Sequence, residues 1–299
     1  MLISMALRAA PVLKRVARIA GSASVALLVA TGCVLAHPSR ATVGAAPADL
    51  GAESVTYSSG SGSTIHAWLA RGVRGAGSVL LLHGVGANRT SMLARARFLH
   101  RLGFTVLAPD LQAHGESTGD HVTFGARESV DAAASMTFLR GAMPEERVGV
   151  IGISMGGAAA LLGSGPLDAN AFVLESVYPT IRQAVSDRLA TWLGPLGGVA
   201  RLFTPVVISV VGNEIGVTES ELRPIDRIGG LRAPLLFLAG TADPYTPIAE
   251  AEALYARAPA PKDYWPVKGA GHEDLFAYDS VQYERRVGGF LSRELRPHN

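Results

Sequence analysis

The chain has 299 residues, 48% of them hydrophobic, which is enough for one large α/β domain with a sizeable core. Its formal net charge of +2 is unevenly distributed, because residues 1–36 carry Arg8, Lys14, Arg15 and Arg18 and no acidic residue. Subtracting these four from the 27 basic residues leaves 23 against 25 acidic ones, so the rest of the chain is slightly acidic. The basic isoelectric point therefore reflects the leader, and the charge argues against a nucleic-acid partner.

Residues 1–36 have the layout of a secretory signal, with a basic segment before an apolar stretch from Ile19 to Ala36. Three outcomes remain open. Signal peptidase would cut after Ala36. Alternatively, residues 30–33 (ATGC) resemble a lipobox, in which Cys33 would carry a lipid and hold the protein on a membrane. Finally, about 18 apolar residues would suffice for an uncleaved membrane anchor. In each case we expect an exported protein, either periplasmic, extracellular or anchored to a membrane.

Two classes of site are absent from the sequence. Cys33 is the only cysteine, so the folded body has no disulfide, no thiol nucleophile and no cysteine-based metal site. The eight histidines are scattered, without an H-E-x-x-H motif or another paired ligand spacing. We therefore expect no metal site.

Alternating strands and helices follow a short N-terminal linker. Residues 37–50 are small and polar, and two strands around the turn at 59–63 predict a hairpin. Apolar strands are then expected at 78–82, 104–108, 148–153, 171–174, 234–238 and 263–267, with helices at 89–101, 126–140, after 154, at 248–257 and at 274–294. Such alternation predicts a parallel sheet with both faces covered and with ligands at the carboxyl ends of its strands.

Residues 177–230 interrupt this alternation. They contain an amphipathic piece, Ile181 to Leu193, and an apolar run, Phe203 to Val211. An insertion of this length between two strands predicts a cap over the site, although the apolar run would also suit an ordinary core helix.

The stretch Val148–Gly157 reads VGVIGISMGG, an apolar strand running into a G-x-S-x-G pattern. This pattern is typical of a nucleophile elbow, in which a serine sits on a sharp turn between a strand and a helix. The backbone of such a turn is strained, and bulky side chains two positions away on either side would clash. Ser154 is therefore the predicted nucleophile, and the Met155 amide is expected to point at the substrate oxygen.

A serine nucleophile needs a base, and the base needs an acid that orients it. His272 follows the strand at 263–267 on a glycine-rich loop, and Asp243 follows the strand at 234–238. Both therefore lie at the carboxyl ends of strands, at the same edge of the sheet as Ser154. The order Ser, Asp, His is the one expected for α/β hydrolases. We predict that Ser154, Asp243 and His272 form a catalytic triad.

The acid of this triad has a rival. Glu175 ends the strand that precedes the insertion, so it would reach the same edge of the sheet. Asp274, by contrast, lies too close to His272 in sequence to be its partner. Asp243 remains the predicted acid, with Glu175 as the alternative.

An oxyanion hole needs two amide donors that point at the developing charge. Met155 is expected to supply one. The other should come from the turn after the first buried strand, His83-Gly84-Val85-Gly86, where Val85 is the best candidate. His83 is expected to brace this turn and not to act as a second base.

The whole span from Ser54 to Leu291 resembles the α/β-hydrolase superfamily of esterase- and lipase-like serine hydrolases. The resemblance rests on the elbow and on four further pieces, HGVGANR at 83–89, DLQAHGES at 110–117, GTAD at 240–243 and GH at 271–272. The second piece is similar to a D-x-R-G-H-G-x-S loop, with Gln112 and Ala113 in place of Arg and Gly.

This resemblance implies an α/β-hydrolase fold over residues 51–299, with a mostly parallel sheet of about eight strands, helices on both faces and a small cap insertion at 177–230. It also implies that no cofactor is needed and that the reaction is hydrolysis of acyl esters. It names no substrate, because this superfamily carries many activities.

The predicted reaction is cleavage of a small-molecule or lipid-like acyl ester through an acyl-enzyme. His272 takes the proton of Ser154, which attacks the carbonyl, while the amides of Val85 and Met155 hold the oxyanion. A peptidase, an amidase or an acyltransferase would use the same triad. A non-enzymatic binding protein is disfavoured, because the serine, the histidine and the acid are all present.

Overall fold

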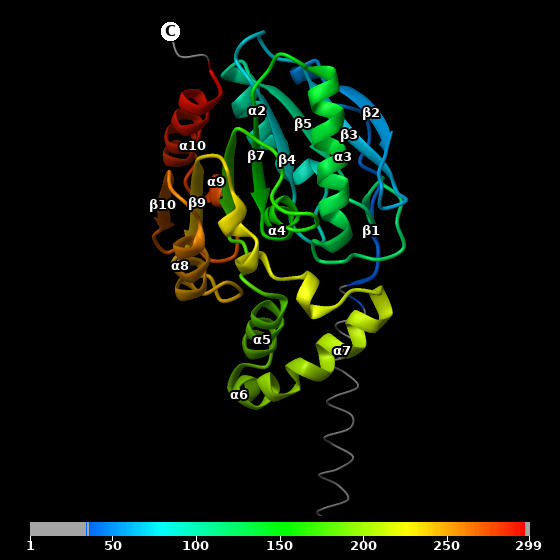
Figure 1. Ribbon diagram of the computed structural model, residues 1–299, viewed down its shortest axis with the longest axis vertical. Helices are drawn as coiled ribbons and strands as arrows, with labels where there is room; N and C mark the ends of the chain where they lie inside the picture. The colour runs from blue at the N-terminus through cyan, green and yellow to red at the C-terminus, as the bar shows by residue number, and fades with distance from the viewer. Residues whose placement is uncertain (1–33, 35, 297–299) are drawn as a thin grey trace, which may run out of the picture.

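The computed structural model describes residue 34 and residues 36–296 (Figure 1). The predicted signal or anchor, including Cys33, lies almost entirely outside the described residues. The predicted linker at 37–50 is described, and it lies against the domain. Its strand β1 (Ser39–Arg40) pairs in parallel with β6 (His114–Gly115).

Eight strands form one sheet in the order β10-β9-β8-β7-β4-β5-β3-β2. Strands β2 and β3 form the predicted hairpin, and β3 also runs antiparallel to β5, while all other neighbours in this sheet are parallel. The strands are β2 (Glu53–Ser58), β3 (Thr64–Ala70), β4 (Ser78–Leu82), β5 (Thr105–Pro109), β7 (Val148–Ile153), β8 (Ala171–Glu175), β9 (Leu235–Gly240) and β10 (Lys262–Val267). The predicted mostly parallel sheet of about eight strands is confirmed.

Apolar side chains pack on both faces of this sheet. Successive side chains of a strand point to opposite faces, so Leu80 and Leu82 of β4 join one buried cluster and Val79 and Leu81 join the other. The first cluster is covered by α3 (Ala126–Ala142), α4 (Met155–Leu161) and α8 (Ile248–Arg257), and the second by α2 (Leu93–Arg101), α9 (Leu275–Tyr278) and α10 (Ser280–Leu295). The predicted covering of both faces is therefore confirmed.

The C-terminal helix differs from its prediction. A single helix was expected over 274–294, but the structure has two helices, α9 and α10, with a break at Asp279. The backbone of Asp279 is non-helical (φ −146°, ψ 75°), and its side chain accepts a hydrogen bond from the Gln282 amide. Asp279 thus caps a new helix, and a side chain that satisfies a free amide in this way favours a helix start over continuation.

Between β8 and β9 the chain leaves the sheet and forms the stretch that was predicted as a cap. Its helices are α5 (Ile181–Trp192), α6 (Gly197–Ala200) and α7 (Thr204–Ile215), which lie together below the sheet in Figure 1. Thr180 caps the start of α5, and Gly216 caps the end of α7 in a left-handed backbone conformation (φ 66°) that suits glycine. Buried side chains on α7 recur every three or four residues, which turns one face of this helix toward the domain.

Candidate active site

Ser154 lies on a strained turn between β7 and α4. Its φ of 49° and ψ of −112° are unusual for a residue with a side chain. The neighbouring glycines explain how the turn fits. A Cβ on Gly152 would lie 2.6 Å from the Gly157 Cα, and a Cβ on Gly156 would lie 2.3 Å from the Leu82 carbonyl oxygen. The glycines of the G-x-S-x-G pattern are thus required by the close approach of the backbone.

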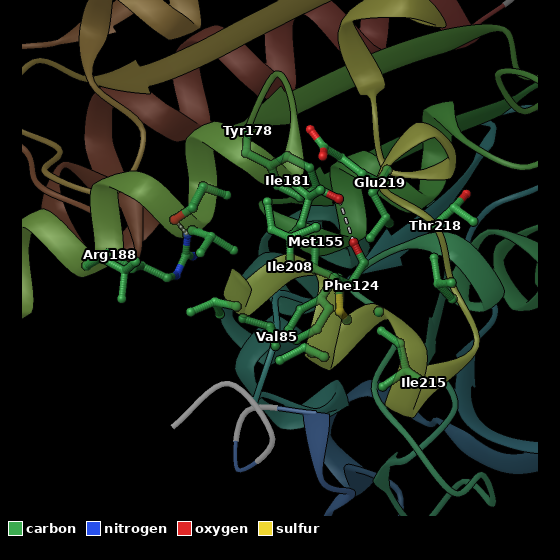
Figure 2. Close-up of a pocket in the computed structure, with 18 of the residues that line it drawn as sticks. Val85, Phe124, Met155, Tyr178, Ile181, Arg188, Ile208, Ile215, Thr218 and Glu219 are labelled. Carbon is green, nitrogen blue, oxygen red and sulfur yellow. Dashed lines mark hydrogen bonds between the residues drawn. The ribbon is translucent and has the colours of Figure 1, made fainter. Parts of the chain in front are cut away.

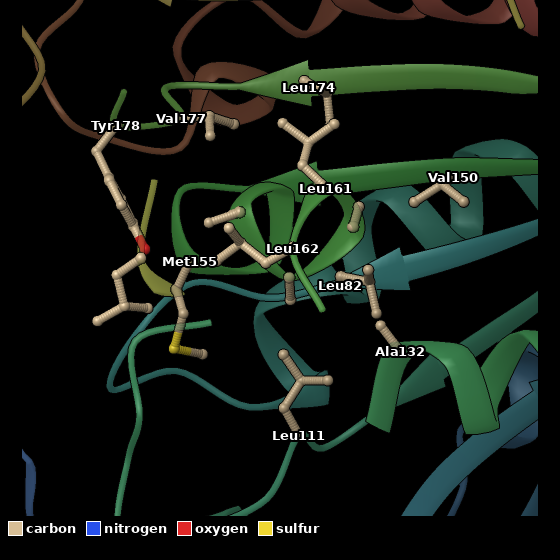
Figure 3. Close-up of a cluster of buried hydrophobic side chains, with 14 of the residues drawn as sticks. Leu82, Leu111, Ala132, Val150, Met155, Leu161, Leu162, Leu174, Val177 and Tyr178 are labelled. Carbon is tan, nitrogen blue, oxygen red and sulfur yellow. The ribbon is translucent and has the colours of Figure 1, made fainter. Parts of the chain in front are cut away.

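The helix after this turn packs closely because small residues, two glycines and three alanines, follow its first residue, Met155. A Cβ on Gly157 would lie 2.3 Å from a methyl group of Val177. Farther along, Leu161 lies in the same buried cluster as Val150 of β7 and Ala132 of α3 (Figure 3). These buried apolar contacts hold the serine turn rigidly at the end of the sheet.

His272 and Asp243 are in direct contact. The His272 Nδ1 lies 2.7 Å from the Asp243 Oδ2, and because a carboxylate can only accept, Nδ1 carries the proton. The other carboxylate oxygen of Asp243 accepts hydrogen bonds from the amides of Tyr245 (2.8 Å) and Thr246 (2.9 Å). The Asp243 side chain is 1% exposed and the His272 side chain 19%. This arrangement fixes the ring, and in the neutral imidazole it makes Nε2 the atom that can accept a proton.

Ser154 and His272 are not joined by a hydrogen bond among the described residues. Apo sites often have long catalytic hydrogen bonds that shorten only when substrate binds. The structure therefore brings the predicted acid and base together, while the contact between the base and Ser154 stays a prediction.

The two other carboxylates considered in the sequence are engaged elsewhere. Glu175 binds Arg95, with 2.8 Å between the Glu175 Oε2 and the Arg95 Nη2, and it also accepts a hydrogen bond from the Tyr283 hydroxyl. Asp274 lies 2.7 Å from another nitrogen of Arg95 and caps α9. Neither carboxylate makes a hydrogen bond to His272, so among these candidates the geometry favours Asp243 as the orienting acid.

Two amides stand beside Ser154. Met155 is the first residue of α4, so its N–H has no acceptor within the helix. Val85 lies in the turn after β4, and its N–H has no protein acceptor among the described residues. A Cβ on Gly84 would lie only 3.8 Å from the Ser154 Cβ, which shows how close this turn comes to the serine. Both predicted oxyanion donors are thus placed near the serine.

Two buried imidazoles hold the Val85 turn. The His83 Nε2 accepts a hydrogen bond from the Leu111 amide (3.0 Å), and its Nδ1 lies 2.8 Å from the Gly84 carbonyl oxygen. The His114 Nε2 accepts from the Gly86 amide (3.1 Å). His83 therefore braces the turn, as predicted from the sequence. The role of His114 was missed, because nothing in the sequence connects this residue of the DLQAHGES loop to a turn 28 residues earlier.

Ser154 opens on an apolar cavity of about 100 Å³ beneath the insertion (Figure 2). Its walls combine Val85 and Phe124, which lie beside the sheet, with Tyr178 at the start of the insertion and the inward faces of α5 and α7. The Tyr178 hydroxyl donates to the Phe124 carbonyl (2.6 Å), which satisfies its only hydrogen and leaves its ring against the cavity. Within the described part of the chain, no group of three or more His, Cys, Asp or Glu side chains is arranged to hold a metal ion.

Comparison with known proteins agrees with this architecture. Residues 79–285 match the Alpha/beta hydrolase family. The chain belongs to this family.

One sequence relative and two solved structures match most of the length of this α/β hydrolase. The uncharacterized protein YqkD of Bacillus subtilis is 25% identical over 224 residues, which are 72% of this chain and 70% of that protein. The structure of an esterase from Pyrococcus furiosus is 23% identical, with a TM-score of 0.72, and the match covers 87% of this chain and 98% of the esterase. An esterase from Exiguobacterium antarcticum is 16% identical, with a TM-score of 0.58 and coverages of 79% and 98%. The two structural likenesses show a shared fold.

The stability of this α/β hydrolase should fall toward acid pH because of His83. Burial, with a smaller effect of nearby His114, lowers the pKa of His83 from 6.5 to about 3. Between pH 6.5 and pH 3 the His83 imidazole is protonated in the unfolded chain and stays neutral in the folded chain. The free energy of unfolding therefore falls as the pH falls through this range. We expect His83 to account for a loss of about 2 kcal/mol between pH 7 and pH 5.

Urea unfolding at both pH values tests this expectation. Between pH 7 and pH 5 the free energy of unfolding should fall by about 2 kcal/mol less in His83→Gln than in the wild type. His37→Gln, which changes an exposed histidine, should keep the full decline. An equal decline in His83→Gln and the wild type would show that His83 is not the group responsible.

Proposed function

We propose that this protein is a serine hydrolase that cleaves carboxylic esters through an acyl-enzyme. The observation that carries the proposal is the 2.7 Å hydrogen bond between His272 and Asp243. This hydrogen bond orients His272 as a base at the edge of the sheet where Ser154 lines an apolar cavity. This combination favours acyl chemistry over a binding role, because simple binding needs neither a strained serine nor a histidine oriented by a buried carboxylate.

The reaction would begin with proton transfer from the Ser154 hydroxyl to the His272 Nε2. The serine oxygen attacks the ester carbonyl carbon, and the amides of Val85 and Met155 stabilise the charge that forms on the carbonyl oxygen. His272 then gives the proton to the departing alcohol, which leaves the acyl group on Ser154. A water molecule, activated by His272, releases the acid. Throughout, Asp243 stays ionised and stabilises the positive imidazolium.

The cavity favours an apolar acyl group of limited size. An engineered cavity of about 150 Å³ accommodates benzene, so a space of this order encloses only a few carbon atoms. Its wall is mostly apolar, with Ile181 and Leu189 of α5 facing Val207 and Val211 of α7. We therefore propose short acyl esters as better substrates than long ones.

Hydrolysis of p-nitrophenyl esters, from acetyl to palmitoyl, tests the proposal. We expect activity, with a higher kcat/KM for butyryl than for palmitoyl, and much slower cleavage of the matching p-nitroanilide. An aryl sulfonyl fluoride should inactivate the enzyme and add its sulfonyl group to the peptide that contains Ser154, with loss of fluoride. A well-folded protein that cleaves no ester would contradict the proposal, and faster cleavage of the anilide would favour an amidase.

A further inference from the structure

The outer side of the cap is apolar. Six of the twelve large apolar side chains that are exposed among the described residues lie on this side, between α5 and the middle of α7. We call them the outer cap face: Trp192, Leu196, Val199, Leu202, Val206 and Val210. Such a concentration of exposed apolar side chains marks a contact surface in soluble proteins.

Helix α7 is apolar on both sides. Val207 and Val211 point inward and are buried, while Val206 (41% exposed) and Val210 (39%) point outward. A surface helix of a globular protein normally turns polar residues to water. The stretch Gly194–Ile215 is long and apolar enough to cross a membrane, with a mean hydropathy of 1.5, although only 28% of its most apolar window is buried. Because α7 packs on α5 and lines the cavity, it suits a position along a lipid surface and not across it.

Charge on the outer cap face also fits a lipid surface. From Leu193 to Asn213 the only charged residue is Arg201, whose side chain is 53% exposed. It lies 3.1 Å from Asp187, which is nearly buried. The face therefore carries little charge: it presents one cation, and the nearest exposed carboxylate on α7, Glu214, lies one turn beyond Val210.

The preceding chain reaches the domain on the same side. The Ser39 hydroxyl donates a hydrogen bond to the Gly86 carbonyl oxygen (3.3 Å). Gly86 directly follows Val85, which lines the cavity. Figure 1 shows the described chain beginning on the side of the sheet where the cap lies. In the sequence, an apolar run from Ile19 precedes this point. If that run entered a bilayer, the domain would be held with its cavity and cap toward the lipid.

We propose that the outer cap face lies on a lipid surface, with Leu202 and Trp192 inserted among the acyl chains. Trp192 connects the two environments, since it lines the cavity and is also 44% exposed. The cavity would then open at the boundary between headgroups and acyl chains. This contact does not depend on the ester chemistry, because it rests on the outward side chains of the cap alone.

Tryptophan fluorescence of the full chain in phosphatidylcholine vesicles tests this contact. The chain has three tryptophans, and Trp68 and Trp265 are buried. Lipids with brominated acyl chains quench only a tryptophan that touches them. We expect quenching relative to unbrominated vesicles, and we expect Trp192→Phe to lose most of it. Absence of bromine-dependent quenching would overturn the proposal.

Matched variants distinguish a specific contact of the cap with lipid from nonspecific adsorption of exposed apolar side chains. The double variant Leu196→Gln/Leu202→Gln should reduce the quenching severalfold. Val73→Gln/Val281→Gln removes side chains of equal exposure, 67% and 76%, outside the cap and should leave the quenching unchanged. Equal effects in both pairs would refute a specific contact. A second copy of the chain on this face would instead protect Trp192 from bromine and give cross-linked dimers, which would also overturn the proposal.

Discussion

Replacement of Ser154 by alanine is expected to lower kcat for ester hydrolysis about 10⁶-fold. The loss should be this large because the hydroxyl oxygen is the attacking atom, and no other side chain in the proposed mechanism replaces it. Alanine meets the same backbone strain as serine at a φ of 49°, and the side chain that it removes is a single oxygen at the edge of a cavity. The fold should therefore survive.

The measurement compares kcat on p-nitrophenyl butyrate with urea unfolding of the same preparations. Ser176→Ala is a matched control, since Ser176 is also buried and also has a positive φ of 49°, at the end of the neighbouring strand β8. It should keep kcat within a few-fold of the wild type. If Ser154→Ala were folded and still active, Ser154 would not be the nucleophile.

The sheet was predictable because its signals are local. Each central strand is a short apolar run, and a strand buried on both faces needs only apolar side chains, as in β4 and β8. The serine turn was predictable for a related reason, since the glycines at 152 and 156 are imposed by backbone contacts within the turn and with the adjacent strand. The apolar strands and the serine turn can therefore each be predicted from a few consecutive residues.

The acid could not be settled by such signals. Glu175 and Asp243 both follow strands that end at the same edge of the sheet, so position in the chain does not distinguish them. What distinguishes them is Arg95, which binds Glu175 from 80 residues away in sequence. A contact between a helix and a distant strand end leaves no periodic pattern, and the same is true of the His114 contact with the Val85 turn.

The N-terminal segment and the insertion illustrate a second limit. A two-residue strand such as β1 is too short for any apolar pattern, so its pairing with β6 could not be expected from residues 37–50. In the insertion, the apolar run 203–211 suited both a cap and a core helix, because hydropathy alone does not tell which side faces the protein. In the structure one side of α7 is buried and the other is exposed.

The choice of acid leads to a second large effect, because Asp243→Asn should lower kcat about 10⁴-fold. One oxygen at this position accepts hydrogen bonds from the amides of Tyr245 and Thr246. An asparagine would keep its oxygen on these two donors, so its NH₂ group would face the His272 Nδ1. The ring would then carry its proton on Nε2, the atom that must accept the proton of Ser154. The expected defect is thus a wrong tautomer in an almost unchanged structure.

Glu175→Gln provides the contrast, because it changes the rival acid by the same replacement of oxygen by nitrogen. Glu175 binds Arg95 inside the core, so this variant should lower the free energy of unfolding by about 3 kcal/mol while the folded enzyme keeps most of its kcat. The measurement is kcat on p-nitrophenyl butyrate for both variants, at a temperature where urea curves show each to be folded. If Asp243→Asn kept its activity and Glu175→Gln lost it, the roles of the two carboxylates would be reversed. The expected result instead makes the 2.7 Å contact between Asp243 and His272 the one that sets the tautomer of the base.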